Sequence, residues 1–249
     1  MEGSNSAANA IERDFRIFFA DKFLLAIMFV NFMIDLGVSG LSLARMITGF
    51  GNYFLYIAPG ANLITATVAA FQSGRDVWRE RIIQDTQPYL LTLPMKRSTF
   101  AASRLFSGML RTTLTTLPGT AVIALLYGLS FPLFLFGVLV MLVYSGAVIG
   151  LSVVAASMAE SLELFTTIRS TVQVYLSFFS TQFYPTQELS LLPPEVSTLS
   201  NFNPMTWAVE SFRALQTGSP DLSLFLPLAG LSAVLLAAGF AFYRRTMEH

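Results

Sequence analysis

The feature that most constrains the fold of this chain is a series of six apolar runs, each long enough to cross a lipid bilayer. A membrane-spanning helix needs about 20 mostly apolar residues to cover the hydrocarbon core. The runs cover Phe23–Leu43, Tyr53–Ser73, Phe106–Tyr127, Leu133–Met158, Ile168–Phe183 and Leu222–Tyr243. The fifth run is the shortest and the most polar. The pattern predicts an all-α, polytopic membrane protein in which residues 1–249 form a single domain with six transmembrane helices.

The composition agrees with a membrane protein. Hydrophobic residues make up 54% of the chain and charged residues only 12%, against about 25% charged residues in soluble domains. The net charge of zero provides no field that would attract nucleic acid, and the absence of cysteine excludes disulfides. Arg13, Arg16 and Lys22 precede the first run, but no small-residue cleavage site follows it, so we expect a retained span and not a signal peptide.

The basic residues indicate how the helices are oriented, because short basic loops stay on the cytoplasmic side of a membrane. Twelve of the fifteen lysines and arginines fall before the first run, in the loop 74–104, at the start of the fifth run or after the sixth. Arg45 and Arg213 lie in the opposite loops, and Arg111 lies inside the third run. We therefore expect a multi-pass protein of the cytoplasmic membrane with both termini in the cytosol.

The cytosolic segment 1–22 is predicted to contain an amphipathic helix over Ala8–Phe19. Its apolar residues fall on one face and its charged residues on the others, which is typical of a helix that lies among the lipid headgroups. The apolar face comprises Ile11, Phe15, Phe18 and Phe19, and the charged residues are Glu12, Arg13 and Arg16. The alternative is a solvated beginning of the first span.

The cytosolic loop 74–104 contains a second predicted helix, bracketed by prolines. Arg75–Gln84 is expected to form a helix that leaves the second span along the membrane surface, and Thr86–Pro94 a short separate helix. Thr86 can cap this short helix and Pro94 ends it. Its exposed side chains include Tyr89, Leu90 and Leu91, and such an apolar patch usually has a protein partner. The alternative is that these side chains rest on the bilayer.

Polar residues in the spans indicate where a substrate could pass, because polar side chains in a membrane bundle face its interior or a cavity. In and just after the fifth run, polar side chains recur every three or four residues, with aromatic residues beside them. The stripe consists of Ser170, Gln173, Ser177, Ser180 and Tyr184, and the second run adds Asn62 and Thr65. This stripe is a candidate substrate path or a dimer interface. Asp35, the one carboxylate well inside a run, is expected near the outer interface, with a ligand or proton role as the alternative.

Small residues and prolines also indicate how the helices pack. Gly146 and Gly150 have the spacing that lets two helices approach closely. Two Pro-Gly pairs, Pro59-Gly60 and Pro118-Gly119, lie inside predicted spans, where a proline removes a backbone hydrogen bond and can kink the helix.

The extracellular segment 184–221 is predicted to contain a short helix started by Asn203 and Pro204. In this helix Trp207, Phe212 and Leu215 are expected to contact lipid, while Glu210 and Arg213 make polar contacts.

Two stretches of the chain resemble one membrane-protein family. Residues 79–97 contain Arg79-Glu80-Arg81, Thr86, Tyr89-Leu90-Leu91-Thr92-Leu93-Pro94 and Arg97, and residues 203–213 read Asn-Pro-Met-Thr-Trp-Ala-Val-Glu-Ser-Phe-Arg. These stretches are similar to the coupling-helix region and to the segment before the last span in type-2 permeases of ABC exporters. Tyr56-Ile57-Ala58-Pro59-Gly60 is similar to the drug and lipid exporter branch of the family. Asp85 and Pro88 depart from the usual Gly and Glu.

The resemblance implies an ATP-driven exporter that moves an amphipathic, lipidic or drug-like compound out across the cytoplasmic membrane. The permease would pair with a second copy or a paralogue, and a separate ABC ATPase would bind ATP and Mg²⁺. The implied docking residues for that ATPase are Glu80, Arg81, Thr86, Tyr89, Leu90, Leu91 and Arg97. The resemblance also implies that the helix before the last span is a re-entrant or surface helix that seals the outer exit, with Asn203, Pro204, Trp207 and Arg213 as its residues. The alternative is an interfacial loop anchored by its tryptophan.

Absences in the sequence agree with a subunit that has no catalytic site and binds no cofactor or metal itself. The chain contains only two lysines, and neither Lys22 nor Lys96 ends a Gly-rich phosphate-binding loop. A membrane-embedded enzyme would need paired carboxylates, a histidine or an acidic cluster, but the spans offer only Asp35, and the one histidine is His249. A passive channel, or export of a polysaccharide or glycolipid, remains as an alternative.

Overall fold

The computed structural model describes residues 11–16, 19, 22–44, 52–84, 96–185 and 193–247, and every regular element in these ranges is helical. The named helices are α2 (Lys22–Ala44), α3 (Tyr53–Ile82), α5 (Arg97–Tyr127), α6 (Phe131–Met158), α7 (Leu162–Phe178), α9 (Pro194–Asn201), α10 (Pro204–Leu215) and α11 (Leu222–Thr246). Residues 11–16 are also helical. The all-α prediction is therefore confirmed for the described ranges.

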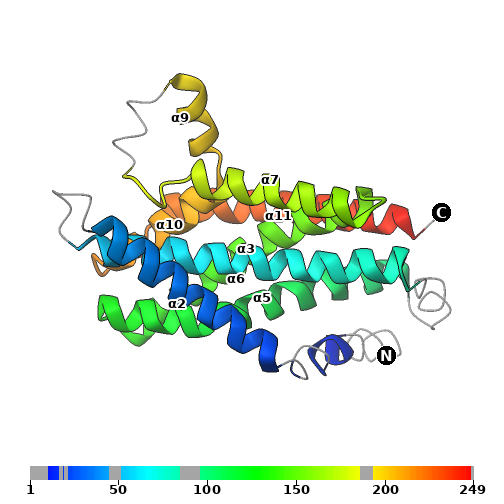
Figure 1. Cartoon of the computed structure of the whole chain (residues 1–249), viewed down its shortest axis with the longest axis horizontal. Coiled ribbons are helices and arrows are strands. Elements are labelled where there is room, and N and C mark those ends of the chain that lie inside the picture. Colours follow the sequence, from blue (N-terminus) through cyan, green and yellow to red (C-terminus); the bar gives the residue numbers. More distant parts are fainter. Residues whose placement is uncertain are drawn as a thin grey trace.

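Five helices, α2, α3, α5, α6 and α11, are long and apolar enough to cross a membrane. The fifth apolar run corresponds to α7, which has 17 residues and a length of about 26 Å, slightly less than the ~30 Å hydrocarbon core. The expectation of six spans is thus confirmed for five. α7 nevertheless lies along the length of the bundle (Figure 1), where it contacts α3 and α6.

One end of the bundle, which we call the charged end, contains Asp14, Asp76, Glu80, Arg104 and Arg111. α2, α5 and α7 lead away from this end, and α3, α6 and α11 return to it (Figure 1). The opposite end, which we call the α10 end, carries α9 and α10. Both described ends of the chain, residues 11–16 and the end of α11, lie at the charged end.

The core of the bundle is formed by α3 and α6, because most residues in the apolar spans of these two helices are buried. α2 and α11 lie at the periphery, where only 22% and 17% of their apolar spans is buried. On α2, Met28, Phe32 and Leu36 are buried, whereas Phe23, Val38 and Leu41 are at least 60% exposed. An apolar side chain that is exposed on a span faces lipid at little cost, because lipid tails are as apolar as leucine.

Glycine permits the closest helix contact, between α6 and α11. A methyl group at Gly150 would lie 2.3 Å from the carbonyl oxygen of Leu235, and one at Gly239 would lie 2.9 Å from the carbonyl oxygen of Gly150. The two backbones therefore touch. The expectation that Gly146 and Gly150 allow two helices to approach closely is confirmed, since Gly146 also faces Ser232 of α11.

The Pro-Gly pairs of α3 and α5 also serve close packing. Both helices are continuous through their prolines, Pro59 and Pro118. A methyl group at Gly60 would collide with the Gln182 side chain, and one at Gly119 would lie 2.2 Å from the Asn62 side-chain oxygen. The glycine of each pair thus makes room for a polar side chain of another segment.

The segment Arg75–Gln84 is helical as expected for all but its last two residues, but as the final turns of α3. With 30 residues, α3 is about 45 Å long and so exceeds the thickness of the hydrocarbon core. The predicted short helix over Thr86–Pro94 lies outside the described residues, as do residues 8–10, 17 and 18 of the amphipathic segment Ala8–Phe19.

The helix predicted to begin at Asn203 and Pro204 is α10, but part of its predicted lipid contact is wrong. Phe212 and Leu215 are only 1% exposed, because they pack against α6 at Gly137. α10 lies among α3, α6, α7 and α11, so this face of the helix contacts protein instead of lipid. The predicted polar contact is confirmed: Arg213 donates a hydrogen bond to Glu210 over 2.8 Å.

Candidate functional site

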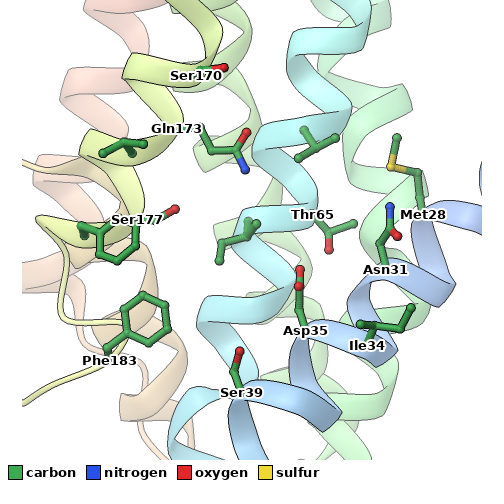
Figure 2. Close-up of a pocket in the computed structure, with 14 residues that line it drawn as sticks. Met28, Asn31, Ile34, Asp35, Ser39, Thr65, Ser170, Gln173, Ser177 and Phe183 are labelled. Atoms are coloured by element: carbon green, nitrogen blue, oxygen red, sulfur yellow. The ribbon is translucent and has the colours of Figure 1, made fainter.

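An open groove of about 610 Å³ is lined by α2, α3, α7 and Phe183. α3 lies between the other two helices (Figure 1) and forms the floor of the groove, while α2 and α7 form its walls. Figure 2 shows polar side chains from all three helices directed toward the same space. A cavity of this size falls in the range that holds drug-sized molecules, about 300–1,000 Å³.

The polar wall contributed by α2 consists of Asn31, Asp35 and Ser39. The three residues follow one another at intervals of four, so they lie on one face of the helix. Asp35, expected near the outer interface, lies within the groove about 14 Å along α2 from Ala44. Asn31 and Ser39 were not predicted as site residues, although their spacing from Asp35 was the signal that could have identified this stripe.

The α7 wall contains three of the five residues of the predicted stripe, namely Ser170, Gln173 and Ser177. The other two, Ser180 and Tyr184, are not among the lining residues, because α7 ends at Phe178 and the chain turns there. Ser180 donates a hydrogen bond back to the Ser177 carbonyl over 2.9 Å, and the Tyr184 hydroxyl donates to the carbonyl of Phe178.

The two polar residues predicted on α3 have different positions. Thr65 lines the floor of the groove and also donates a hydrogen bond to the Ala61 carbonyl. Asn62 is fully buried and faces α5, where its side-chain nitrogen donates to Thr120 over 3.0 Å and to the carbonyl of Thr116 over 3.3 Å. Asn62 therefore joins two helices and does not line the groove.

The remaining lining of the groove is apolar and aromatic. Phe178 and Phe183 pack with their ring centroids 5.9 Å apart at the α7 side. The other apolar lining residues are Met28, Ile34, Ile64, Val68 and Val174. The groove thus combines an apolar lining with a few convergent polar groups, the usual composition of a small-molecule site.

The charged end holds a network of buried ion pairs that fastens the N-terminal segment to the bundle. Arg104 of α5, whose side chain is 7% exposed, donates to Asp14 over 2.7 Å and to Glu80 over 2.5 Å. Asp14 also accepts from Ser107 over 2.9 Å and pairs with Arg13. Burial alone would raise the pKa of the Asp14 carboxyl, but Arg104, Arg13 and Ser107 outweigh burial and hold that pKa below its ordinary value.

A second contact at the charged end joins the end of α3 to the end of α6. The Arg81 guanidinium donates to the carbonyls of Ser157 and Ala159, each over 2.5 Å, and the Trp78 ring nitrogen donates to Ala159 over 3.1 Å. A cation at a helix C-terminus satisfies carbonyls that have no partner within the helix and complements the helix dipole.

Three of the seven predicted ATPase-docking residues lie within the described ranges. Glu80 and Arg81 make contacts within the chain, and Arg97 is exposed at the start of α5. Thr86, Tyr89, Leu90 and Leu91 lie outside the described residues. The docking role of all of them stays a prediction.

The predicted extracellular seal residues hold α10 against its neighbours. The Asn203 side chain accepts from the amide of Met205, which caps α10, and its nitrogen donates to three carbonyls at the end of α7, those of Tyr175, Leu176 and Phe179. Pro204 begins α10 and is buried, and Trp207 is half-buried. Arg213 donates to the Tyr56 carbonyl of α3, and its guanidinium carbon lies 3.5 Å from the centroid of the Tyr56 ring.

Within the described ranges, no three histidine, cysteine or acidic side chains come together in a way that could hold a metal ion. The carboxylates at the charged end are instead paired with arginines. What the described residues can offer a small molecule is the groove, with one carboxylate, amides, hydroxyls and aromatic rings.

Comparison with known proteins identifies the family. No curated protein matches the chain, whereas the family model of the ABC-2 type transporter matches residues 9–217. The match includes α2 to α10, and so it contains both the groove and the charged end. The chain therefore belongs to the ABC-2 type transporter family.

Proposed function

We propose that this chain is the permease subunit of an ATP-driven exporter that moves an amphipathic, lipidic or drug-like compound out across the cytoplasmic membrane. The observation that carries the proposal is the groove between α2, α3 and α7, which occurs in a membrane domain of the ABC-2 family. Its apolar lining suits the body of such a compound, and its polar groups suit a headgroup.

The energy for transport comes, in this proposal, from a separate ABC ATPase. The 249 residues contain no phosphate-binding loop, so ATP and Mg²⁺ would bind to the partner. The docking site is the segment that connects α3 to α5, with Tyr89, Leu90 and Leu91 as its apolar contacts.

The contacts at both ends of this segment support a role in transmitting force. Arg81 fastens the end of α3 to α6, and Glu80 binds Arg104 near the start of α5. Because the helices on either side are held by several bonds, a push on the segment would reach the bundle instead of being absorbed by a loose connection.

The proposed topology places the charged end in the cytosol, because basic residues are retained there. α7 then serves as the sixth span, completed by the turn after Phe178. Both termini are cytosolic, and α10 lies near the outer surface. A second copy or a paralogue completes the transporter, with the open side of the groove available to face it or the lipid.

The docking proposal predicts the effect of replacing both Leu90 and Leu91 with Asp. Two carboxylates in an apolar contact would remain unpaired and desolvated, so the ATPase should no longer co-purify with the tagged permease, while membrane insertion stays normal. The readouts are co-purifying ATP hydrolysis, identification of a phosphate-loop protein by mass spectrometry, and the amount of permease in the membrane fraction.

A matched control is Leu199→Asp, since Leu199 is an exposed leucine on α9 at the opposite end of the bundle. This variant should keep the ATPase. Unchanged association in the Leu90 and Leu91 double variant would remove the docking assignment. ATP-independent flux of a lipophilic dye through vesicles that contain the permease alone would instead favour a passive channel.

A further inference from the structure

Among the residues that line the groove, only Asp35 carries a charge. Its carboxylate is directed into the space between α2 and α3, close to Thr65, and Gln173 reaches toward the same space from α7 (Figure 2). The other polar lining residues are amides and hydroxyls: Asn31, Ser39, Thr65, Ser170, Gln173 and Ser177. The charge of the groove is therefore set by one residue.

No described basic side chain neutralises this carboxylate. The ion pairs within the described ranges involve other acidic residues, namely Asp14, Asp76, Glu80, Glu12 and Glu210. The Asp35 side chain is half-buried. A lone charge inside a membrane-spanning segment is costly, and such residues usually face a cavity and mark a substrate or ion pathway.

We propose that Asp35 is the acceptor for the positive charge of the substrate, and that the substrates are amphipathic organic cations such as protonated or quaternary amines with large apolar bodies. This inference deepens the proposed transport function and rests on it. A bound cation would offset the cost of the unpaired carboxylate, whereas an anion in the same groove would meet like charge with no basic side chain to balance it.

The rest of the groove fits the same class of compound. The faces of Phe178 and Phe183 attract a cation through the ring quadrupole, and the amide oxygens of Asn31 and Gln173 can accept hydrogen bonds from an ammonium group. Met28, Ile34 and Ile64 provide apolar surface for the body of the molecule. A volume of about 610 Å³ accommodates several aromatic rings.

Two lipophilic ions of the same shape test the proposal, tetraphenylphosphonium and tetraphenylborate. Binding of each is measured to the full chain in lipid nanodiscs, with empty nanodiscs as the blank for partition into lipid. The wild-type chain should bind the cation at least about tenfold more tightly than the anion. This factor is the contribution expected from one pair of opposite charges in a water-accessible groove. Equal binding of the two ions would overturn the proposal.

Variants locate the effect at Asp35. Asp35→Asn should weaken binding of the cation about tenfold and largely abolish the preference for the cation, while Asp35→Glu should retain the preference. The control is Glu163→Gln, which removes a carboxylate that is exposed on α7 and does not line the groove, and it should bind as the wild type does.

Unchanged cation affinity in Asp35→Asn would overturn the proposal. The same holds if Asp35→Asn changes the oligomeric state of the chain but not its affinity for the cation. The binding experiment uses neither ATP nor an ATPase. A failure of the cation-binding proposal is therefore distinguishable from a failure of the permease proposal, which the Leu90 and Leu91 double variant tests. The comparison of the two ions on the wild-type chain provides an answer even if a variant folds poorly.

Discussion

The buried carboxylate of Asp14 predicts a specific weakness in the attachment of the N-terminal segment. Asp14→Asn removes one negative charge from a side chain that is 3% exposed and accepts from Arg104 and Ser107. The matched control is Glu12→Gln, in the same helical segment. Glu12 also pairs with an arginine, Arg16, but both side chains of that pair are more than half exposed.

The expected magnitudes differ because of burial. Hydrogen bonds to charged groups contribute about 1.5–3 kcal/mol, against about 1 kcal/mol for neutral ones. The amide introduced by Asp14→Asn would keep one acceptor oxygen but lose the ion pair with Arg104, so we expect the attachment to weaken by about 2 kcal/mol. An exposed ion pair is worth about 0–1 kcal/mol, so Glu12→Gln should cost only about a few tenths of a kcal/mol.

Limited proteolysis measures this attachment directly. When opening is fast, the rate of cleavage follows the population of the open state, and about 2 kcal/mol corresponds to a rate roughly thirtyfold higher. Trypsin cleavage after Arg16 should therefore accelerate about thirtyfold in Asp14→Asn and less than about twofold in Glu12→Gln. Equal cleavage rates in the two variants would refute the reasoning that the buried network holds the segment.

Two further predictions concern pH and helix packing. The Asp14 pKa is held below its ordinary value of 3.8, so its ion pair is fully stabilising above that pH and is lost as the pH falls further. The detachment of the N-terminal segment, followed by the mobility of a spin label on that segment because trypsin itself is inactive in acid, should be constant from about pH 5 to 8, should rise below about pH 4, and should lose this dependence in Asp14→Asn. At the contact of α6 and α11, Gly150→Ala brings a methyl group 2.3 Å from a backbone oxygen and should destabilise the bundle by about 1–3 kcal/mol, measured as a lower thermal unfolding midpoint in detergent. Gly230→Ala, also a helical glycine but with nothing within 4 Å of the added methyl, should leave the midpoint unchanged or raise it.

The sequence was sufficient to predict the apolar helices but not where each one ends. Hydropathy marks the part of a helix that lies in lipid, and α3 continues for nine residues past the apolar run that ends at Ser73, through most of the helix predicted over Arg75–Gln84. The continuation is polar, and tertiary contacts hold it: Trp78 and Arg81 bind the carbonyls at the end of α6. Contacts of this kind join residues about 80 positions apart, so a local pattern cannot reveal them.

Only part of the groove was predicted, because the local sequence pattern does not show which distant helices surround a polar residue. Helical spacing correctly grouped Ser170, Gln173 and Ser177, but it also included Ser180, because nothing in the local pattern showed that α7 ends at Phe178. Asn62 has the same polar character as Thr65, and only the position of α5 decides that it is a packing residue.

The same limit applies to α10 and α2. Phe212 was expected to contact lipid, but it fills the space left by Gly137 of α6. An apolar side chain has the same pattern in the sequence whether lipid or protein covers it. On α2 the spacing of Asn31, Asp35 and Ser39 was visible in the sequence, yet its meaning depended on α7 lying across the groove.

Packing also determines which parts of the groove can move. Its floor, α3, is locked on two sides, because Gly74 touches the backbone of α6 at Ser152 and Asn62 is inserted against Gly119 of α5. The walls are held much less firmly: in α7 only Phe165, Leu176 and Ser177 are buried, and only 22% of the apolar span of α2 is buried. Tightly packed interiors resist small displacements, whereas weakly packed elements open at low cost. A change in the width of the groove must therefore come from α2 and α7, the two helices that carry Asp35 and Gln173.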